Sequence, residues 1–129
     1  YEEPYKNIAI ELFGRGDAYE ILKTKGLVYF MTTSFIRGVT IQDSVILIDE
    51  CQNMSFHELD SIITRVGQGC RVIFSGDFRQ ADLTKNGLKD FIRVLKAMDK
   101  FDLIDFEIKD IVRSDFVKQY ITAKTNLGL

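Results

Sequence analysis

Two apolar runs, each followed by acidic residues, constrain the fold of this chain more than any other feature. The first, residues 45–48, leads directly into Asp49 and Glu50; the second, residues 71–75, is followed by Gly and then Asp77. Runs without regular polar positions are typical of strands buried on both faces, as in a parallel sheet covered by helices. Ligands of such sheets bind outside the carboxyl ends of the strands. The sequence therefore predicts that the acidic groups of both runs converge at one edge of a parallel sheet.

Helical periodicity surrounds these runs. Predicted helices lie at about residues 5–13, ended by Gly14; at 17–22, opened by Asp17; from the capping box of Ser55 and Glu58 to Gly67; from about 87 to 98; and after Ser114. Two further strands are predicted at residues 27–31 and 103–108. Strands that alternate with helices predict an α/β fold with a parallel sheet.

Length and composition predict one domain without a membrane segment. A chain of 129 residues is large enough for one core. The net charge of −2 provides no global attraction to nucleic acid, so any such contact must come from a local patch. No apolar stretch approaches the length of a membrane span, and nothing resembles a signal peptide. Cys51, Cys70 and the single His57 lack the spacing of a zinc site, and we interpret both cysteines as small buried residues of a reducing cytosol.

The carboxylates after the first run favour chemistry on a nucleotide. Acidic groups at the tip of a buried strand cost free energy unless they hold a cation or accept hydrogen bonds. An Asp that holds Mg²⁺ beside a Glu that polarises water is the Walker B arrangement of nucleotide hydrolases, although Asp49 could also simply cap the next helix. Gln80, beyond the second run, can both donate and accept hydrogen bonds, which suits a γ-phosphate or an attacking water. The two runs together favour a nucleotide-hydrolysis site over a purely structural helix cap.

At the level of longer blocks, the sequence resembles the PhoH-like family, whose ATPase core is related to the RecA-like domains of superfamily 1 helicases. The matching blocks are residues 36–40, 45–53, 63–67, 75–83 and 110–114, with Val117. The most specific are Asp-Glu-Cys-Gln-Asn and Gly-Asp-Phe-Arg-Gln-Ala-Asp-Leu, and Cys51 stands where alanine is more usual. The resemblance implies a parallel-sheet, RecA-like P-loop NTPase core with three layers, α/β/α.

The resemblance also implies roles for single residues. Asp49 would hold Mg²⁺, directly or through water, and Glu50 would be the general base for the hydrolytic water. Gln80 would contact the γ-phosphate of ATP, with Asp77 orienting it. Arg113 would also meet the γ-phosphate, where a guanidinium neutralises developing charge. The alternative for Arg113 is a surface salt bridge.

A loop ahead of the first run is a candidate nucleic-acid contact. In related helicases the neighbourhood of Arg37, Gly38 and Thr40 faces the nucleic-acid strand, and one cation with hydroxyls and a glycine suits phosphate. The same residues equally suit an ordinary turn. For Arg65 we favour a structural role, because a cation near the carboxyl end of a helix meets the helix dipole favourably.

One expected motif is absent from the sequence. No Gly-x-x-x-x-Gly-Lys-[Ser/Thr] occurs in residues 1–129, so nothing in the chain would cradle the β- and γ-phosphates. In PhoH-like proteins that Walker A segment lies upstream of the matching region. The chain, which opens at Tyr1 within an amphipathic pattern, is therefore predicted to be a single-domain fragment, incomplete at its N-terminal side and inactive alone, of a cytoplasmic ATP hydrolase.

More than one function is consistent with these residues. The main prediction is ATP–Mg²⁺ hydrolysis coupled to RNA or DNA, and an arginine supplied by a neighbouring subunit would make the protein a homo-oligomer. The alternative from another class is a non-catalytic α/β module that keeps the fold for binding or assembly. A Mg²⁺-dependent nuclease using Asp49, Glu50, Asp77 and Asp82 is disfavoured, because it leaves Gln80 and Arg113 without a role.

Overall fold

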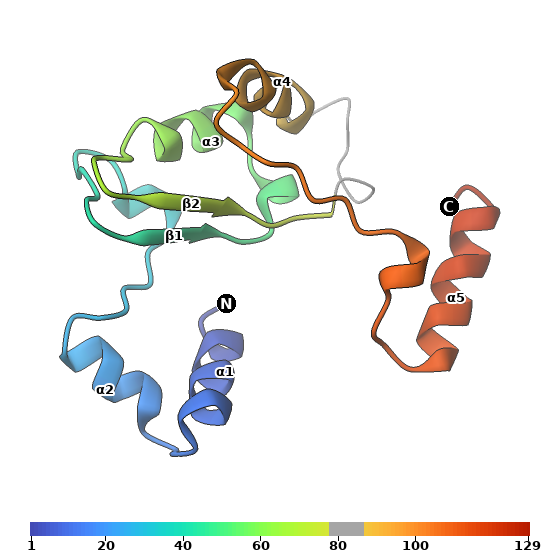
Figure 1. Cartoon of the computed structure of the whole chain (residues 1–129), viewed down its shortest axis with the longest axis horizontal. Helices are drawn as coiled ribbons and strands as arrows, with labels where there is room; N and C mark the ends of the chain where they lie inside the picture. The colour runs from blue at the N-terminus through green and yellow to red at the C-terminus, as the bar shows by residue number, and fades with distance from the viewer. Residues whose placement is uncertain (78–86) are drawn as a thin grey trace. The chain divides into compact units, whose positions relative to one another are not determined.

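The computed structural model describes residues 1–77 and 87–129, which divide into two separately compact units, residues 1–93 and 94–129 (Figure 1). In chain order the α-helices and strands are α1 (Glu3–Phe13), α2 (Ala18–Thr24), β1 (Val45–Ile48), α3 (Phe56–Ile63), β2 (Arg71–Phe74), α4 (Leu88–Met98) and α5 (Asp115–Asn126). Short 3₁₀ helices lie at η1 (Thr33–Phe35), η2 (Cys51–Asn53) and η4 (Ile108–Asp110). No helix in the described part of the chain is both long and apolar enough to cross a membrane.

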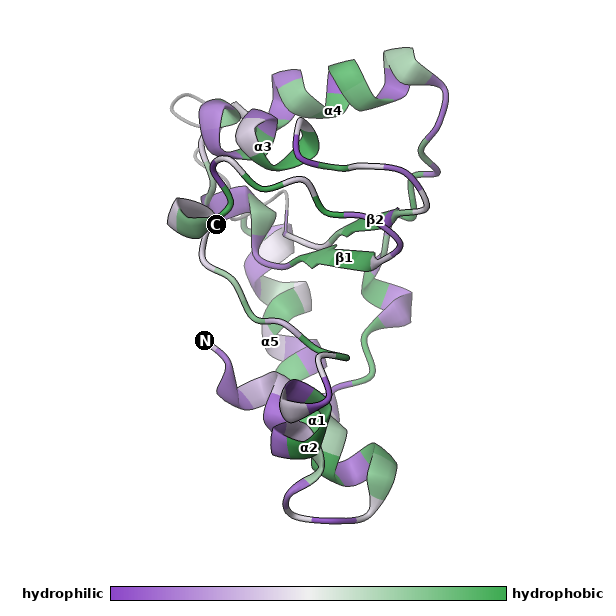
Figure 2. Cartoon of the chain, turned by 90° about the vertical axis from the view of Figure 1, so that its left-hand side faces the viewer, coloured by the Kyte–Doolittle hydropathy of each residue, from purple (hydrophilic) through white to green (hydrophobic). Residues whose placement is uncertain are grey.

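The two predicted acidic-tipped strands pair with each other in parallel. Val45 lies opposite Arg71 and Ile48 opposite Phe74, so the carboxyl ends of β1 and β2 are in register. Figure 2 shows that β1 is apolar along its length, and β2 is apolar after its first residue, Arg71. The prediction of a mixed α/β fold with parallel strands is confirmed.

One face of this strand pair is packed and the other is exposed. On the packed face Ile48 is buried, and the ring of Phe74 meets the ring of Phe91 in α4 edge-on at 5.1 Å. On the opposite face Val45, Leu47 and Ile73 expose 68%, 51% and 51% of their surface. Among the described residues, packing therefore covers only one of the two faces that the predicted α/β/α arrangement would cover.

Helix α3 begins as predicted and ends a turn early. The Ser55 hydroxyl accepts a hydrogen bond from the Glu58 amide at 3.2 Å, and the Glu58 carboxylate accepts from the Ser55 amide at 2.8 Å, which completes the capping box. The predicted end at Gly67 is wrong. Val66 instead forms a parallel bridge with Ile41, and this tertiary pairing draws the chain out of the helix after Ile63.

The predicted strands at residues 27–31 and 103–108 do not form. A strand needs a neighbour for its backbone groups, and within the described residues the only strand ladder joins β1 and β2. The Leu27 amide instead closes the end of α2 by donating to the Leu22 carbonyl at 2.9 Å. Ile108 begins η4, whose first turn is held by the Asp110 carboxylate.

Helices α1 and α2 form a hairpin with a small core of its own, around Ala9, Ala18 and Tyr19. Gly14 ends α1 in the left-handed conformation, with φ of 66°, as its predicted position after the helix requires. Helix α2 continues beyond its predicted end to Thr24. The Asp17 carboxylate does not cap α2; it pairs with the Arg15 guanidinium at 2.6 Å.

In the second unit α5 begins where it was predicted. The Ser114 hydroxyl accepts a hydrogen bond from the Val117 amide, which confirms it as the N-cap. The apolar side of this helix is exposed: Phe116 and Tyr120 expose 81% and 63% of their surface.

Candidate functional site

The ends of β1 and β2 remain joined by hydrogen bonds after the strands themselves stop. The Ser75 amide donates to the Ile48 carbonyl at 2.8 Å, and the Cys51 amide donates to the Ser75 carbonyl at 3.0 Å. Glu50, between these bonds, has φ of 53° and ψ of 38°, a left-handed conformation that a side chain with Cβ adopts rarely. This sharp turn carries the chain from the strand directly into η2.

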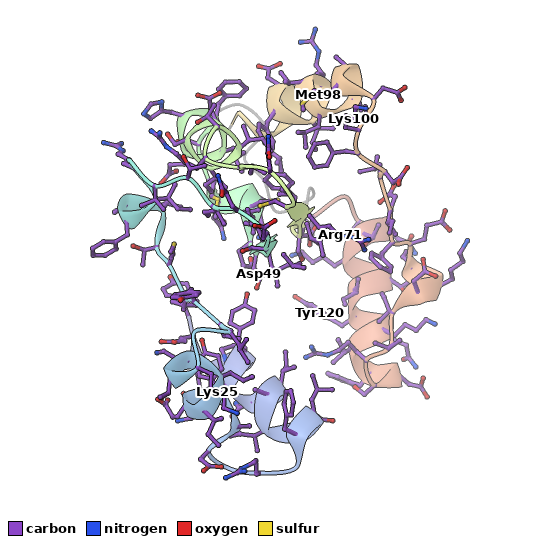
Figure 3. All side chains as sticks on the ribbon, turned by 60° about the vertical axis from the view of Figure 1, so that its left-hand side comes forward. Lys25, Asp49, Arg71, Met98, Lys100 and Tyr120 are labelled. Atoms are coloured by element: carbon purple, nitrogen blue, oxygen red, sulfur yellow. The ribbon has the colours of Figure 1, made fainter. Side chains whose placement is uncertain are left out.

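Asp49, the first carboxylate after β1, is exposed at the strand end (Figure 3) and accepts two hydrogen bonds. The Tyr5 hydroxyl, from α1, donates to Oδ2 at 2.5 Å, and the Glu50 amide donates to Oδ1 at 3.0 Å. Burial, followed by the hydrogen bond to Asp49, raises the pKa of Tyr5 to about 12, which keeps this hydroxyl a donor. Sequence reasoning missed Tyr5, because its position in the apolar pattern of α1 indicates packing alone.

The Glu50 carboxylate is held by amide groups from its own turn. Its Oε2 accepts from Nε2 of Gln52 at 2.5 Å and, more weakly, from Nδ2 of Asn53 at 3.5 Å. Neutral donors orient a carboxylate without placing a positive charge beside it. Gln52, a second residue without a predicted role, is buried, and its other end accepts from the Asp77 amide at 3.1 Å.

The predicted partners from the second strand end are placed only in part. Asp77 is half-buried three residues after the end of β2 at Phe74, next to the β1 end through its bond to Gln52. Gln80 and Asp82 lie in residues 78–86, outside the described part of the chain. Arg113 belongs to the second unit, where it is exposed between η4 and α5.

The donor set at the β1 end suits a hard cation with few protein ligands. Among residues 1–77 and 87–129, no three His, Cys, Asp or Glu side chains gather as a metal-binding group. Mg²⁺ keeps several of its waters and takes one or two carboxylates, so the exposed oxygen ligands of Asp49 fit it. The carboxylate could hold the ion directly or through water.

The predicted nucleic-acid loop lies against α3. Ile36 anchors the loop by being buried, while Arg37, Gly38 and Thr40 are exposed, and Gly38 has φ of 83°. Arg37 lines a hollow of about 190 Å³. The other residues that line it are Thr33, Ser34, Glu58 and Ser61.

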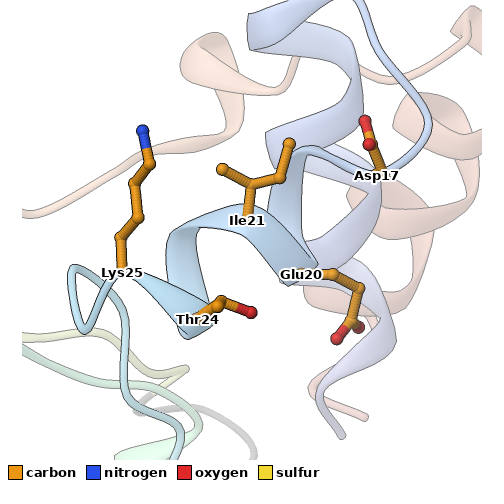
Figure 4. A pocket seen from close by; sticks show the side chains of 5 residues that line it. All are labelled: Asp17, Glu20, Ile21, Thr24 and Lys25. Atoms are coloured by element: carbon orange, nitrogen blue, oxygen red, sulfur yellow. The ribbon is translucent and has the colours of Figure 1, made fainter.

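A second hollow, of about 240 Å³, lies along α2 (Figure 4). It is lined by Asp17, Glu20, Ile21, Thr24 and Lys25. All of these belong to one short helix or its ends, and the Asp17 carboxylate is already paired with Arg15. This hollow contains no arrangement of groups suited to catalysis.

Both cysteines are free thiols placed near the strand ends. Cys51 is buried, as predicted, and burial raises the pKa of its thiol. Cys70 is only half-buried, and its thiol donates to the Ile41 carbonyl at 3.3 Å.

Comparison with known proteins identifies the family. The sequence pattern of the family described as PhoH-like protein matches residues 4–125. The chain belongs to the PhoH-like family. Membership in this family implies a P-loop NTPase fold.

Individual relatives agree with this assignment. The chain is 30% identical, over 95% of its length, to the PhoH-like protein of Bacillus subtilis, and 26% identical, again over 95%, to the protein PhoH of Escherichia coli. A shorter match, 39% identical over 52% of the chain, joins it to the protein PhoH2 of Bacillus subtilis. The chain spans 39%, 36% and 15% of the lengths of these three relatives.

Proposed function

We propose that this chain is part of a PhoH-like ATPase that hydrolyses ATP with Mg²⁺ and couples hydrolysis to RNA or DNA. The observation that carries the proposal is the adjacent pair Asp49 and Glu50 at the carboxyl end of a parallel strand, with Asp77 at the end of its neighbour. That edge is where parallel sheets bind ligands. Its carboxylates are separately oriented, one by a tyrosine hydroxyl and the other by amides.

The proposed chemistry divides between the two carboxylates. Asp49 holds Mg²⁺, which supplies charge neutralisation at the phosphate oxygens when bound. Glu50 takes a proton from the attacking water at its carboxylate. Asp77 orients Gln80 toward the γ-phosphate, and Arg113 meets the charge that develops there.

The remaining parts of the proposal concern the whole protein. We propose that residues 1–129 are one part of the RecA-like, three-layer domain, with the phosphate-binding loop supplied from outside them. A cytoplasmic location and a homo-oligomer that completes the site belong to the same proposal.

Contact with nucleic acid is proposed at the loop of Arg37, Gly38 and Thr40. In the hollow beside this loop the Arg37 guanidinium is accompanied by the hydroxyls of Thr33, Ser34 and Ser61, which are groups that bind phosphate. The Glu58 carboxylate in the same hollow is occupied by the α3 capping box.

Substitution of the proposed base tests the function. In the full-length protein Glu50→Gln should retain ATP binding and lower hydrolysis by about 10²–10⁴-fold, the usual contribution of general base catalysis. Glu11→Gln, which changes an exposed carboxylate of α1, is the matched control. ATPase rates should be measured with and without RNA or DNA.

Near-normal turnover of Glu50→Gln would overturn the assignment of the base. If the wild-type protein binds ATP but does not hydrolyse it under any condition, the alternative of a non-catalytic binding module is favoured.

A further inference from the structure

Gln52 is the one buried polar side chain among the described residues, with 3% of its surface exposed. Burying a carboxamide costs free energy unless both its ends are hydrogen-bonded. Its position in η2, two residues after the proposed base, makes it the candidate for a role that the proposed function does not yet use.

The two ends of this carboxamide bind different strand ends. Nε2 donates to the Glu50 carboxylate at 2.5 Å, while Oε1 accepts from the Asp77 backbone amide at 3.1 Å. Only the amide nitrogen can donate to a carboxylate and only the carbonyl oxygen can accept from an N–H group, so the orientation of the carboxamide follows from its partners. Gln52 thus links the turn after β1 to the start of the segment after β2.

Gly76 provides the space that this link occupies. A Cβ at residue 76 would lie 2.6 Å from Oε1 of Gln52 and 2.7 Å from Sγ of Cys51. The φ angle of Gly76 is not in the left-handed range, so a larger residue would meet no backbone strain there but would force the Gln52 carboxamide and the Cys51 thiol to shift. The hydrogen bonds of Gln52 and the lack of a side chain at Gly76 are two independent observations, and both indicate that the carboxamide has a defined position between the strand ends.

The Glu50 backbone explains why such a support is needed. Its left-handed conformation is rarely populated and persists only where surrounding contacts hold it. The hydrogen bond from Gln52 constrains the Glu50 carboxylate in this turn. The second bond, from the Asp77 amide to Gln52, fixes the position of Gln52 relative to the end of the neighbouring strand, β2.

We propose that Gln52 is a positioning residue for Glu50, and that Gly76 is required for Gln52 to reach both strand ends. This inference rests on the proposed function, in which Glu50 is the general base. Gln52 acts through Glu50 and not on the nucleotide, so its loss affects turnover and spares binding.

The test uses Gln52→Leu, Gln52→Asn and Gly76→Ala in the full-length protein. Leucine fills the buried space without hydrogen bonds, asparagine is too short to reach both partners, and alanine displaces the native carboxamide. Each variant should lower kcat by about 10- to 100-fold, as expected when an outer partner is lost or a reacting group is displaced by an ångström. KM for ATP and Kd for ADP should change little, and Gln119→Leu, at an exposed position of α5, should resemble wild type.

A double-mutant cycle separates positioning from stability. If Gln52 acts through Glu50, Gln52→Leu should cause no further fall in kcat when Glu50 is already Gln. An equal fall in both backgrounds would overturn the proposal, as would loss of folding in all three variants, judged by melting temperature. If Gln52→Leu alone fails to fold, Gln52→Asn and Gly76→Ala carry the test.

The outcomes also distinguish this inference from the proposed function. Normal turnover of Glu50→Gln would show that Glu50 is not the general base, and the positioning role of Gln52 would then fall together with the proposed function. Inactive Glu50→Gln together with normal kcat in the Gln52 and Gly76 variants overturns the positioning role alone.

Discussion

At the scale of single residues, two tyrosine hydroxyls are held in their protonated state. Burial raises the pKa of Tyr5 to about 12, and the carboxylate of Asp49 adds to this effect. Burial likewise raises the pKa of Tyr19 to about 12, with the carboxylate of Glu2 as the second cause. Both phenols donate to an acidic group, so ionisation would place two negative charges in contact.

Two of the five tyrosines should therefore ionise about two pH units above the ordinary value. Because the folded-state pKa is raised, these groups contribute stability that is complete below about pH 10 and is lost as pH rises toward 12. Titration of tyrosinate absorbance should show the late steps, and Tyr5→Phe and Tyr19→Phe should each remove one. The double variant serves as the control, because a late signal that persists in it would contradict the assignment.

At the scale of elements, several helix boundaries that depend on local signals were predicted correctly, whereas several features that depend on tertiary pairing were not. The α1 end at Gly14 and the N-caps of α3 and α5 depend on neighbouring residues alone, and all three were predicted. The end of α3 and the absence of strands at residues 27–31 and 103–108 depend on distant backbone partners, which an apolar pattern does not specify.

The α3 capping box provides a test at this scale. Ser55→Ala should lower the free energy of unfolding by about 1 kcal/mol, the typical contribution of an N-cap. The Ser55 amide and hydroxyl lower the pKa of Glu58, so this carboxylate adds stability at neutral pH that is lost as pH falls below its ordinary value of 4.5. Glu58→Gln should be less stable than wild type at neutral pH, and the difference should shrink in acid.

Urea unfolding at neutral and acidic pH measures both effects. Ser61→Ala in the same helix is the control for stability, because the Ser61 hydroxyl donates to the His57 carbonyl and takes no part in the capping box, and the change should stay within about 0.5 kcal/mol. A difference for Glu58→Gln that stays constant in acid would contradict the role of its charge.

At the scale of the whole molecule, the chain has carboxylates suited to a metal and to a base, and no glycine-rich phosphate loop in its sequence. We therefore expect the 129-residue chain alone to bind ATP–Mg²⁺ weakly or not at all, because its carboxylates provide no cradle for anionic oxygens. Calorimetric titration measures this, with the full-length protein as the control. Low-micromolar affinity of the chain alone would contradict the expectation and require another phosphate site.

Residue patterns along the chain are enough to predict that Asp49, Glu50 and Asp77 follow strands of a parallel α/β fold, because apolar runs and helix caps are local properties. Two sets of hydrogen bonds become evident only in the folded chain: the bond of the Tyr5 hydroxyl to Asp49, and the bonds of the Gln52 carboxamide to Glu50 and Asp77. Tyr5 and Asp49 are 44 positions apart, and Gln52 and Asp77 are 25 apart. A hydrogen bond over such a separation depends on the packing of whole elements, which the pattern of either segment does not contain.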